Sequence, residues 1–376
     1  MKLAVPKEQG PGEQRVALVP GELARLPGID VLVQRGAGEQ ALFGDDEYEA
    51  AGATVVASAE ELYGSAELVV KVQPPTVEEA DLLAEGASVL SLLVPTANLP
   101  AVRRLAERKA TAFSFELVPR ISRAQVMDAL SSQATVAGYR AVLIAANRLS
   151  KFFPLFMTAA GTVAPARVLV MGAGVAGLQA IATARRLGAV VSAYDVRVAA
   201  KEEVKSLGAT FLELSLEAQE GTGGYAGAQS EEFVARQQQL IGSHVAASDV
   251  VITTAAVPGR RAPVLVTEPM VAAMRPGSII VDLAAATGGN CELTKDGEEV
   301  TFNGVHVLAA GELAATMPTH ASMLFARNVS SFVKLLVKEG RLEPDFNDEI
   351  VSQSAVVVAG DVRNAAARAA LEEAHT

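Results

Sequence analysis

The segment Arg167-Val-Leu-Val-Met-Gly-Ala-Gly-Val-Ala-Gly-Leu places an apolar run directly before three glycines, Gly172, Gly174 and Gly177. This spacing predicts a strand, a tight turn and a helix. Gly172 permits the turn, Gly174 lets the backbone approach a phosphate, and Gly177 lets the helix pack closely on the strand. Because the N-terminus of such a helix offers unbonded N–H groups and a positive dipole, the segment predicts a site for a dinucleotide pyrophosphate.

The residues after the glycines extend this pattern to a βαβ unit. Residues 178–187 are predicted to form a helix that Gly188 ends, and residues 190–194 the next strand. Asp195 follows the glycines by about 20 residues, as the dinucleotide-binding motif requires. Its carboxylate would accept hydrogen bonds from the adenosine ribose and repel a 2′-phosphate, which favours NAD(H) over NADP(H), although the nearby Arg197 weakens this preference. The alternative is a glycine-rich turn followed by an incidental acid.

Composition limits the class of protein. The 376 residues suffice for about two domains, and half of them are hydrophobic, which predicts a globular chain with an ample core. A formal charge of -11 argues against nucleic acid and anionic lipid as partners. The single cysteine, Cys291, excludes an internal disulfide and fits a reducing compartment such as the cytoplasm. Neither a signal peptide nor an apolar stretch long enough to span a membrane is evident, so membrane contact is expected only through a partner.

Short β-branched runs alternate with amphipathic or Ala-rich segments, which is typical of parallel α/β layers. A first group of predicted strands comprises residues 3–5, 31–34, 54–56, 68–72, 89–94 and 111–115. A second group comprises residues 168–171, 190–194, 210–214, 250–253, 278–282 and 306–309. The pattern predicts an α/β fold with two doubly wound parallel-sheet, Rossmann-like domains, linked by long helices over residues 124–147 and 322–338.

The domain boundaries follow from these helices. We expect an N-terminal α/β domain over residues 1–135 plus 335–376, and a Rossmann NAD(H)-binding domain over residues 136–334. Paired domains of this kind commonly bind substrate in a cleft, at the C-terminal ends of strands. The glycine-rich segment 215–230 around Tyr225 is a long loop, for which a lid and a simple connection are the two interpretations.

Several motifs together carry a resemblance to a known family. They are Met127-Asp-Ala-Leu-Ser-Ser-Gln, Ala137-Gly-Tyr-Arg-Ala-Val, Gly172-Ala-Gly-Val-Ala-Gly, Thr253-Thr, Pro258-Gly, Val281-Asp-Leu-Ala-Ala and Gly288-Gly-Asn-Cys-Glu. As a set they resemble the NAD(H)-binding domain of proton-translocating nicotinamide nucleotide transhydrogenases, within a broader family that includes alanine dehydrogenase. In that family this domain precedes transmembrane helices or forms a separate subunit. Because this chain reaches Thr376 without a span, it resembles the separate-subunit (alpha subunit, domain I) form.

The resemblance implies roles for individual residues. Arg120, Gln125 and Asp128, with Ser131 one turn further on, match the set that orients the nicotinamide end, where an amide and a hydroxyl can pair with the carboxamide. Arg120 can pair with Asp128 or a phosphate. The alternative is that these residues cap the long helix.

The resemblance also implies contacts with the cofactor NAD. The predicted cofactor-binding residues are Gly172, Gly174, Val175, Ala176, Gly177, Asp195, Val196, Arg197, Gly224, Ala256 and Val257. The loop that carries Tyr225 resembles a mobile loop that closes over the bound nucleotide. No constellation of metal ligands is present in the sequence.

Alanine dehydrogenases hold their substrate with an Arg and a Lys, which match Arg15 and Lys71 here. Their catalytic His is absent after the fifth strand, where the sequence reads Leu93-Val-Pro-Thr-Ala-Asn, and their active-site Asp is replaced in Ala285-Ala-Thr. Oxidative deamination needs a proton acceptor, whereas hydride exchange between two nicotinamides needs alignment and exclusion of water. The sequence thus favours a transhydrogenase, with Arg15 and Lys71 as a vestigial pocket or salt bridges.

None of the four histidines supplies the missing base. His244, His306 and His375 are expected to be structural or exposed, and His320 is a polar residue at a helix start, with contact to cofactor as its alternative. The predicted function is direct hydride transfer from NADH to NADP⁺ held by a beta subunit, coupled to proton translocation by membrane partners. A homodimer, bound peripherally at the cytoplasmic membrane, is implied by the family. An alanine dehydrogenase-like oxidoreductase and a non-enzymatic NAD(H)-sensing module are the alternatives.

Overall fold

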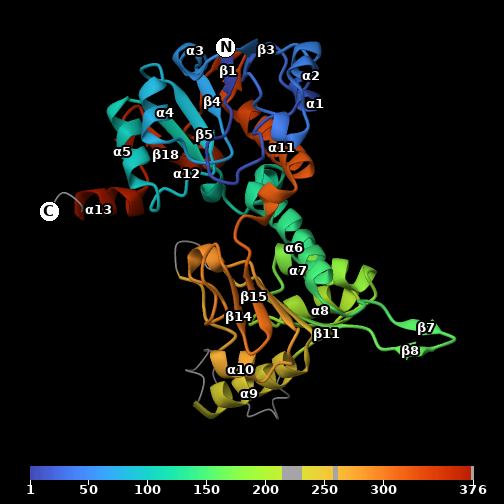
Figure 1. Cartoon of the computed structure of the whole chain (residues 1–376). Coiled ribbons are helices and arrows are strands. Elements are labelled where there is room, and N and C mark those ends of the chain that lie inside the picture. Colours follow the sequence, from blue (N-terminus) through green and yellow to red (C-terminus); the bar gives the residue numbers. More distant parts are fainter. Residues whose placement is uncertain (214–230, 257–260, 374–376) are drawn as a thin grey trace. The chain divides into compact units, whose positions relative to one another are not determined.

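The computed structural model describes residues 1–213, 231–256 and 261–373, without the side chains of residues 231–237 (Figure 1). The chain divides into two compact units: unit 1 is Met1–Gln133 with Ala314–Thr376, and unit 2 is Ala134–Leu313. The return of the C-terminal segment to the first domain is therefore confirmed. Residues 314–334 also lie in unit 1, although the sequence pattern placed them in the second domain.

Unit 1 is built on a sheet whose described strands have the order β19-β18-β6-β5-β4-β1-β2-β3. The strands are β1 (Lys2–Val5), β2 (Asp30–Gln34), β3 (Thr54–Val56), β4 (Leu68–Val70), β5 (Ser88–Ser91), β6 (Thr111–Ser114), β18 (Ala355–Val358) and β19 (Asp361–Val362). Strands β1 to β6 are parallel, and β18 and β19 add an antiparallel edge. The strand order reverses between β1 and β4, as in doubly wound folds.

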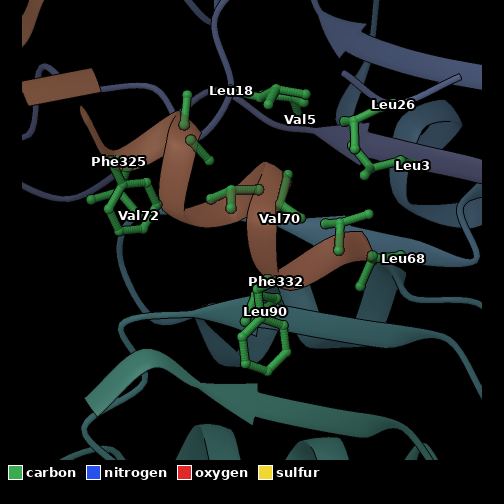
Figure 2. Close-up of a cluster of buried hydrophobic side chains, with 14 of the residues drawn as sticks. Leu3, Val5, Leu18, Leu26, Leu68, Val70, Val72, Leu90, Phe325 and Phe332 are labelled. Atoms are coloured by element: carbon green, nitrogen blue, oxygen red, sulfur yellow. The ribbon is translucent and has the colours of Figure 1, made fainter. Parts of the chain in front are cut away.

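The helices of unit 1 are α1 (Pro20–Leu23), α2 (Asp45–Ala50), α3 (Ala59–Ser65), α4 (Val77–Leu82), α5 (Leu99–Glu107), α11 (Pro318–Leu336), α12 (Glu349–Ser354) and α13 (Ala365–Glu373), with a small hairpin of β16 (Val337–Lys338) and β17 (Arg341–Leu342). Helix α11 belongs to this unit because its apolar face packs on the sheet. Phe325 and Phe332 lie among Leu68, Val70 and Leu90 (Figure 2). Burying a side chain of that size contributes roughly 1.5–3 kcal/mol.

Unit 2 contains a second doubly wound sheet with the described order β11-β10-β9-β12-β13-β15-β14. Its strands are β9 (Arg167–Met171), β10 (Val190–Tyr194), β11 (Thr210–Phe211), β12 (Val250–Thr253), β13 (Ile279–Asp282), β14 (Glu299–Phe302) and β15 (Val305–Ala309). Only β14, at one edge, is antiparallel among the described strands of this sheet. The helices are α7 (Val175–Arg186), α8 (Ala200–Ser206), α9 (Glu231–Ala247) and α10 (Glu268–Ala272). A separate hairpin of β7 (Phe156–Thr158) and β8 (Gly161–Val163) extends from this unit (Figure 1).

The predicted α/β class with two doubly wound domains is confirmed. The predicted helix over residues 124–147 is divided, however, into a 3-10 helix, η3 (Ser122–Met127), and α6 (Ala129–Arg148). The break falls at Asp128, whose side chain caps α6. Within the described residues, no helix combines the length and apolar character that crossing a bilayer requires.

Candidate functional site

The glycine-rich turn of unit 2 joins β9 to α7. Gly172 has a φ of +101°, which L side chains rarely adopt, and its N–H donates to the Tyr194 carbonyl at 2.8 Å. A Cβ on Gly177 would lie 1.8 Å from the Gly172 carbonyl oxygen, so the first turn of α7 can approach the strand only with glycine there. These are the tight turn and the close packing that the glycine spacing predicts.

Gly174, the residue before α7, leaves the helix N-terminus open. Among the described residues, no side chain caps the helix at this position, and a Cβ on Gly174 would meet no atom within 4 Å. The first-turn N–H groups have no intrahelical partners. Val175 is exposed and Ala176 is half-buried in this turn. The open turn, its N–H donors and the helix dipole fit a phosphate group.

Asp195 follows β10 and contacts the glycine turn. Its Oδ2 accepts from the Ala173 N–H at 2.7 Å and from Arg197 Nη2 at 3.1 Å, while Oδ1 accepts from the Arg197 N–H at 2.8 Å and from Nε at 3.1 Å. Burial raises the pKa of this carboxyl, but the hydrogen bonds from Arg197 and Ala173 outweigh it and hold the pKa below its ordinary value. Asp195 is therefore an ionised acceptor at neutral pH. The next residue, Val196, is exposed.

The segment after β12 is fastened to the same turn. Thr254 Oγ1 donates to the Gly172 carbonyl at 3.1 Å. Asn290 Oδ1 accepts from the Ala255 N–H at 2.9 Å, and Asn290 Nδ2 donates to the Ala255 carbonyl at 2.8 Å. Asn290 therefore fixes both backbone groups of Ala255.

Asp282, at the end of β13, is fully buried and orders the surrounding loops. Its carboxylate accepts from Thr253 Oγ1 at 2.9 Å, Ala284 N at 3.0 Å, Asn290 N at 2.7 Å, Cys291 N at 3.0 Å and Thr294 Oγ1 at 2.7 Å. These donors offset the cost of burying a carboxylate. Asp282 and Asn290 were not predicted as site residues from the sequence, although an acid at the C-terminal end of an apolar strand was an available signal.

The remaining predicted cofactor residues stand at or beyond the limits of the described chain. Ala256 is exposed and is the last residue before a gap. Val257, Gly224 and Tyr225 lie outside the described residues. The lid and the loop against the cofactor therefore stay predictions.

The residues that match the nicotinamide set lie in unit 1, before and within the first turn of α6. Asp128 Oδ1 accepts from the Ser131 N–H at 2.8 Å, and its Oδ2 accepts from the Ser131 hydroxyl at 2.6 Å. Asp128 is thus a helix cap, as the alternative interpretation states. Arg120 and Gln125 are exposed, and within the described residues Arg120 forms no ion pair with Asp128.

Arg15 is buried in unit 1 and paired within the chain. Its Nε and Nη2 lie 2.7 Å and 2.6 Å from the two Glu13 carboxylate oxygens, and its Nη1 donates to Gln133 Oε1 at 2.9 Å. Although burial raises the pKa of Glu13, the hydrogen bonds and charge of Arg15 outweigh it and the pKa is lowered. The guanidinium charge is therefore neutralised by the chain itself.

Lys71 is equally buried, with 1% of its surface exposed. Its Nζ lies 2.6 Å from Glu79 Oε1 and 3.4 Å from Glu8 Oε2, and the Tyr63 hydroxyl donates to Glu79 Oε1 at 2.9 Å. Burial raises the pKa of Glu8 despite the nearby ammonium. Arg15 and Lys71 are salt-bridged residues, one of the two alternatives that the sequence left for them.

The turn after β5 is built without a histidine. Val94 has a φ of +42°, and Asn98 Nδ2 donates to the carbonyls of Leu93 at 2.9 Å and Val94 at 3.3 Å. An amide has no proton-accepting function near neutral pH. The turn therefore offers no general base from these residues.

Other titratable groups lie apart from this chemistry. His306 Nδ1 lies 3.2 Å from Glu299 at the sheet edge, and His320 is exposed in the first turn of α11. Burial raises the pKa of the Cys291 thiol to about 11. In the described ranges, no group of three or more His, Cys, Asp or Glu side chains is arranged to hold a metal ion.

Two doubly wound domains, one with an open glycine turn and an acid at the end of its second strand, define a dinucleotide-binding α/β protein of the Rossmann type. Comparison with known families specifies it further. The descriptions "Alanine dehydrogenase/PNT, N-terminal domain" and "Alanine dehydrogenase/PNT, C-terminal domain" match residues 4–137 and 141–365. The chain belongs to the alanine dehydrogenase/PNT family, which confirms the resemblance found in the sequence.

Individual relatives come from both branches of the family. An NAD(P) transhydrogenase subunit alpha of Rhodospirillum rubrum is 46% identical over 374 residues, covering 96% of this chain and 97% of that protein. The solved structure of the transhydrogenase from Sinorhizobium meliloti matches with a TM-score of 0.89 at 43% identity, over 96% of this chain and 100% of that one. A solved L-alanine dehydrogenase matches with a TM-score of 0.85 at 27% identity, over 99% of both chains. Because both share the fold, individual residues must distinguish the two activities.

Proposed function

We propose that this chain is the NAD(H)-binding subunit of a proton-translocating transhydrogenase. The observation that carries the proposal is the similarity to the Rhodospirillum rubrum subunit over 96% of the chain, which includes both units rather than the glycine turn alone. The bound cofactor would supply a hydride from its nicotinamide C4 to NADP⁺ on a partner subunit, giving NAD⁺ and NADPH without a proton or a covalent enzyme intermediate.

In unit 2, the residues of this chain would hold the adenosine and pyrophosphate groups. The turn at Gly172, Gly174 and Gly177 offers backbone donors to the pyrophosphate, with Val175 and Ala176 in the first helical turn. Asp195 would accept from the adenosine ribose, beside Val196 and Arg197. Asp282 and Asn290 would act as positioning residues, because they fix the segment that leads to Ala256 and Val257.

In unit 1, Arg120 and Gln125 would orient the nicotinamide end, since their exposed side chains carry charge and amide donors. Asp128 would position Ser131 through the two hydrogen bonds between them. Gly224 and Tyr225 would belong to a loop that closes over the nucleotide and excludes water. This division of roles requires alignment of two nicotinamides and no general base.

Amino-acid dehydrogenation is disfavoured by the contacts of Arg15 and Lys71. Both cations already bind carboxylates of the chain, and the turn at Asn98 supplies no proton acceptor. A 2-oxoacid would have to displace Glu13 or Glu79, each at hydrogen-bond distance from a buried cation. The alanine dehydrogenase activity of relatives in the family is therefore the second candidate.

The partners in this proposal are the membrane-spanning subunits and the NADP(H)-binding beta subunit, which would hold the chain peripherally at the cytoplasmic membrane. A second copy of the chain is also proposed, because the β7–β8 hairpin and the residues leading into it present exposed apolar side chains. These are Phe152, Leu155, Phe156, Met157 and Val163, with Met157 78% exposed. A two-stranded hairpin is marginally stable alone in water, so an apolar partner surface would stabilise it.

Sedimentation velocity tests the dimer. Met157→Lys places a charge on the hairpin and is expected to yield monomers. Leu42→Lys, at a side chain of unit 1 that is 76% exposed, is the matched control and should leave the dimer intact. A dimer that survives Met157→Lys unchanged would contradict the hairpin interface.

The proposed activity is tested by NADH oxidation in a sample whose NADH binding has been verified by nucleotide fluorescence. One arm supplies pyruvate and ammonium, and the other supplies NADP⁺ with membranes that contain the partner subunits. We expect turnover only in the second arm. Turnover with pyruvate and ammonium would identify an amino-acid dehydrogenase, and binding without turnover in either arm would identify an NAD(H)-sensing module.

A further inference from the structure

We infer that Arg197 is a specificity-determining residue at the adenosine end of the proposed NADH site: its guanidinium occupies the Asp195 carboxylate, and the adenosine ribose must displace it. The inference rests on the proposed function, because it concerns how the same site discriminates NADH from NADPH. It follows from the contacts around Asp195.

The carboxylate of Asp195 has all its acceptor positions filled. Its two oxygens accept four hydrogen bonds, from the Ala173 N–H and from the N–H, Nε and Nη2 of Arg197. Two carboxylate oxygens offer about four lone-pair positions in total. A ribose diol can bind Asp195 only if some of these donors leave.

The guanidinium is the group that can leave. Its side chain is 61% exposed, whereas that of Asp195 is 7% exposed and the two backbone donors are fixed in their turns. Arg197 Nη2 also donates to the Ala173 carbonyl at 3.2 Å, which holds the guanidinium against the glycine turn. An ion pair exposed on one side is weak, so exchanging it for two hydroxyl donors costs little.

The same pair explains how a 2′-phosphate would be excluded. While Asp195 is ionised, it neutralises Arg197 and repels a phosphate at short range. Without that charge, the planar guanidinium would present paired donors that match a phosphate. Glu203 acts on the Arg197 charge from α8 but has a smaller influence than Asp195. Asp195 therefore suppresses a latent NADPH site that Arg197 would otherwise form.

Fluorescence titrations with NADH and NADPH test this in four proteins: wild type, Asp195→Asn, Arg197→Met and the double variant. Asn keeps an acceptor for the Ala173 N–H without the charge, and Met keeps the unbranched stem of Arg. Asp195→Asn should weaken NADH binding by about tenfold and strengthen NADPH binding by about tenfold, which corresponds to one hydrogen bond to a charged group in each case. The gain for NADPH should disappear in the double variant. Arg197→Met alone should bind NADH at least as tightly as wild type.

Arg186→Met, at an exposed arginine near the end of α7, is the matched control and should bind both nucleotides as wild type does. The inference is overturned if Asp195→Asn gains no NADPH affinity, if the double variant keeps the gain, or if Arg197→Met loses NADH affinity. Failure of the wild type to bind NADH would instead refute the proposed function.

Discussion

Two alanine substitutions in one turn should separate nucleotide binding from folding. Gly174 has a φ of -77°, which alanine adopts without strain, and a Cβ there meets no atom within 4 Å among the described residues. Gly174→Ala should therefore leave the free energy of unfolding within about 0.5 kcal/mol of wild type. The added methyl would stand where the pyrophosphate is proposed to approach the backbone. NADH affinity should fall at least about tenfold, or about 1.4 kcal/mol.

Gly177→Ala should have the opposite profile. Its Cβ would lie 1.8 Å from the Gly172 carbonyl oxygen, and ordinary contact begins near 3.4 Å, so the two backbones must separate by about 1.6 Å. Moving α7 away from β9 loses packing around the turn. We expect the free energy of unfolding to fall by about 3 kcal/mol, at the upper end of overpacking costs.

Urea denaturation followed by circular dichroism, with NADH titration by fluorescence, measures both quantities on the same samples. Gly242→Ala is the matched control, because its Cβ would come no closer than 3.7 Å to Met270 in the interior of α9. That substitution should be neutral or stabilising by up to about 1 kcal/mol. Normal NADH binding by Gly174→Ala, or unchanged stability of Gly177→Ala, would refute the reasoning.

Three individual side chains give further tests of the packing and the charges. Asn290→Ala removes three side-chain hydrogen bonds to backbone groups and should lower the free energy of unfolding by about 3 kcal/mol in urea, whereas Asn147→Ala, exposed in α6, should not. Cys291 should react slowly with a disulfide reagent near neutral pH, because burial raises its pKa to about 11, and reaction should accelerate only on unfolding. Because the pKa of Glu13 is lowered from 4.5 on folding, its contribution to stability is present above pH 4.5 and is lost as the pH falls through the lowered value. The stability difference between wild type and Glu13→Gln, measured by denaturation against pH, should therefore narrow in acid; a constant difference would contradict the ion pair.

The parallel strands of both sheets could be predicted because buried parallel strands form short, continuous β-branched runs. The edge strands escaped this reasoning. β14 and β18 are antiparallel, and the hairpin strands β7 and β8 are fully exposed, so none has a continuous buried run with helices on either side. The break at Asp128 depended on a side-chain cap, which a pattern of apolar residues does not reveal.

The site was predictable where a local motif fixes the backbone and not where distant segments meet. Gly172, Gly177 and Asp195 follow from spacing within one βαβ unit. The contacts of Asp282 and Asn290 join segments separated by up to 35 residues, and the ion pair of Lys71 with Glu8 joins residues far apart in the chain. Such partners are known only once the strands are in register.

The central claim is direct transfer of hydride between two nicotinamide nucleotides. It is tested most directly with NADH deuterated at the transferred C4 position, incubated with NADP⁺, this chain and the partner subunits, with mass spectrometry of the NADPH formed. The account predicts that the deuterium is recovered in NADPH without incorporation of solvent hydrogen at C4. Loss of the label to water, or NADPH that carries solvent hydrogen at C4, would contradict it.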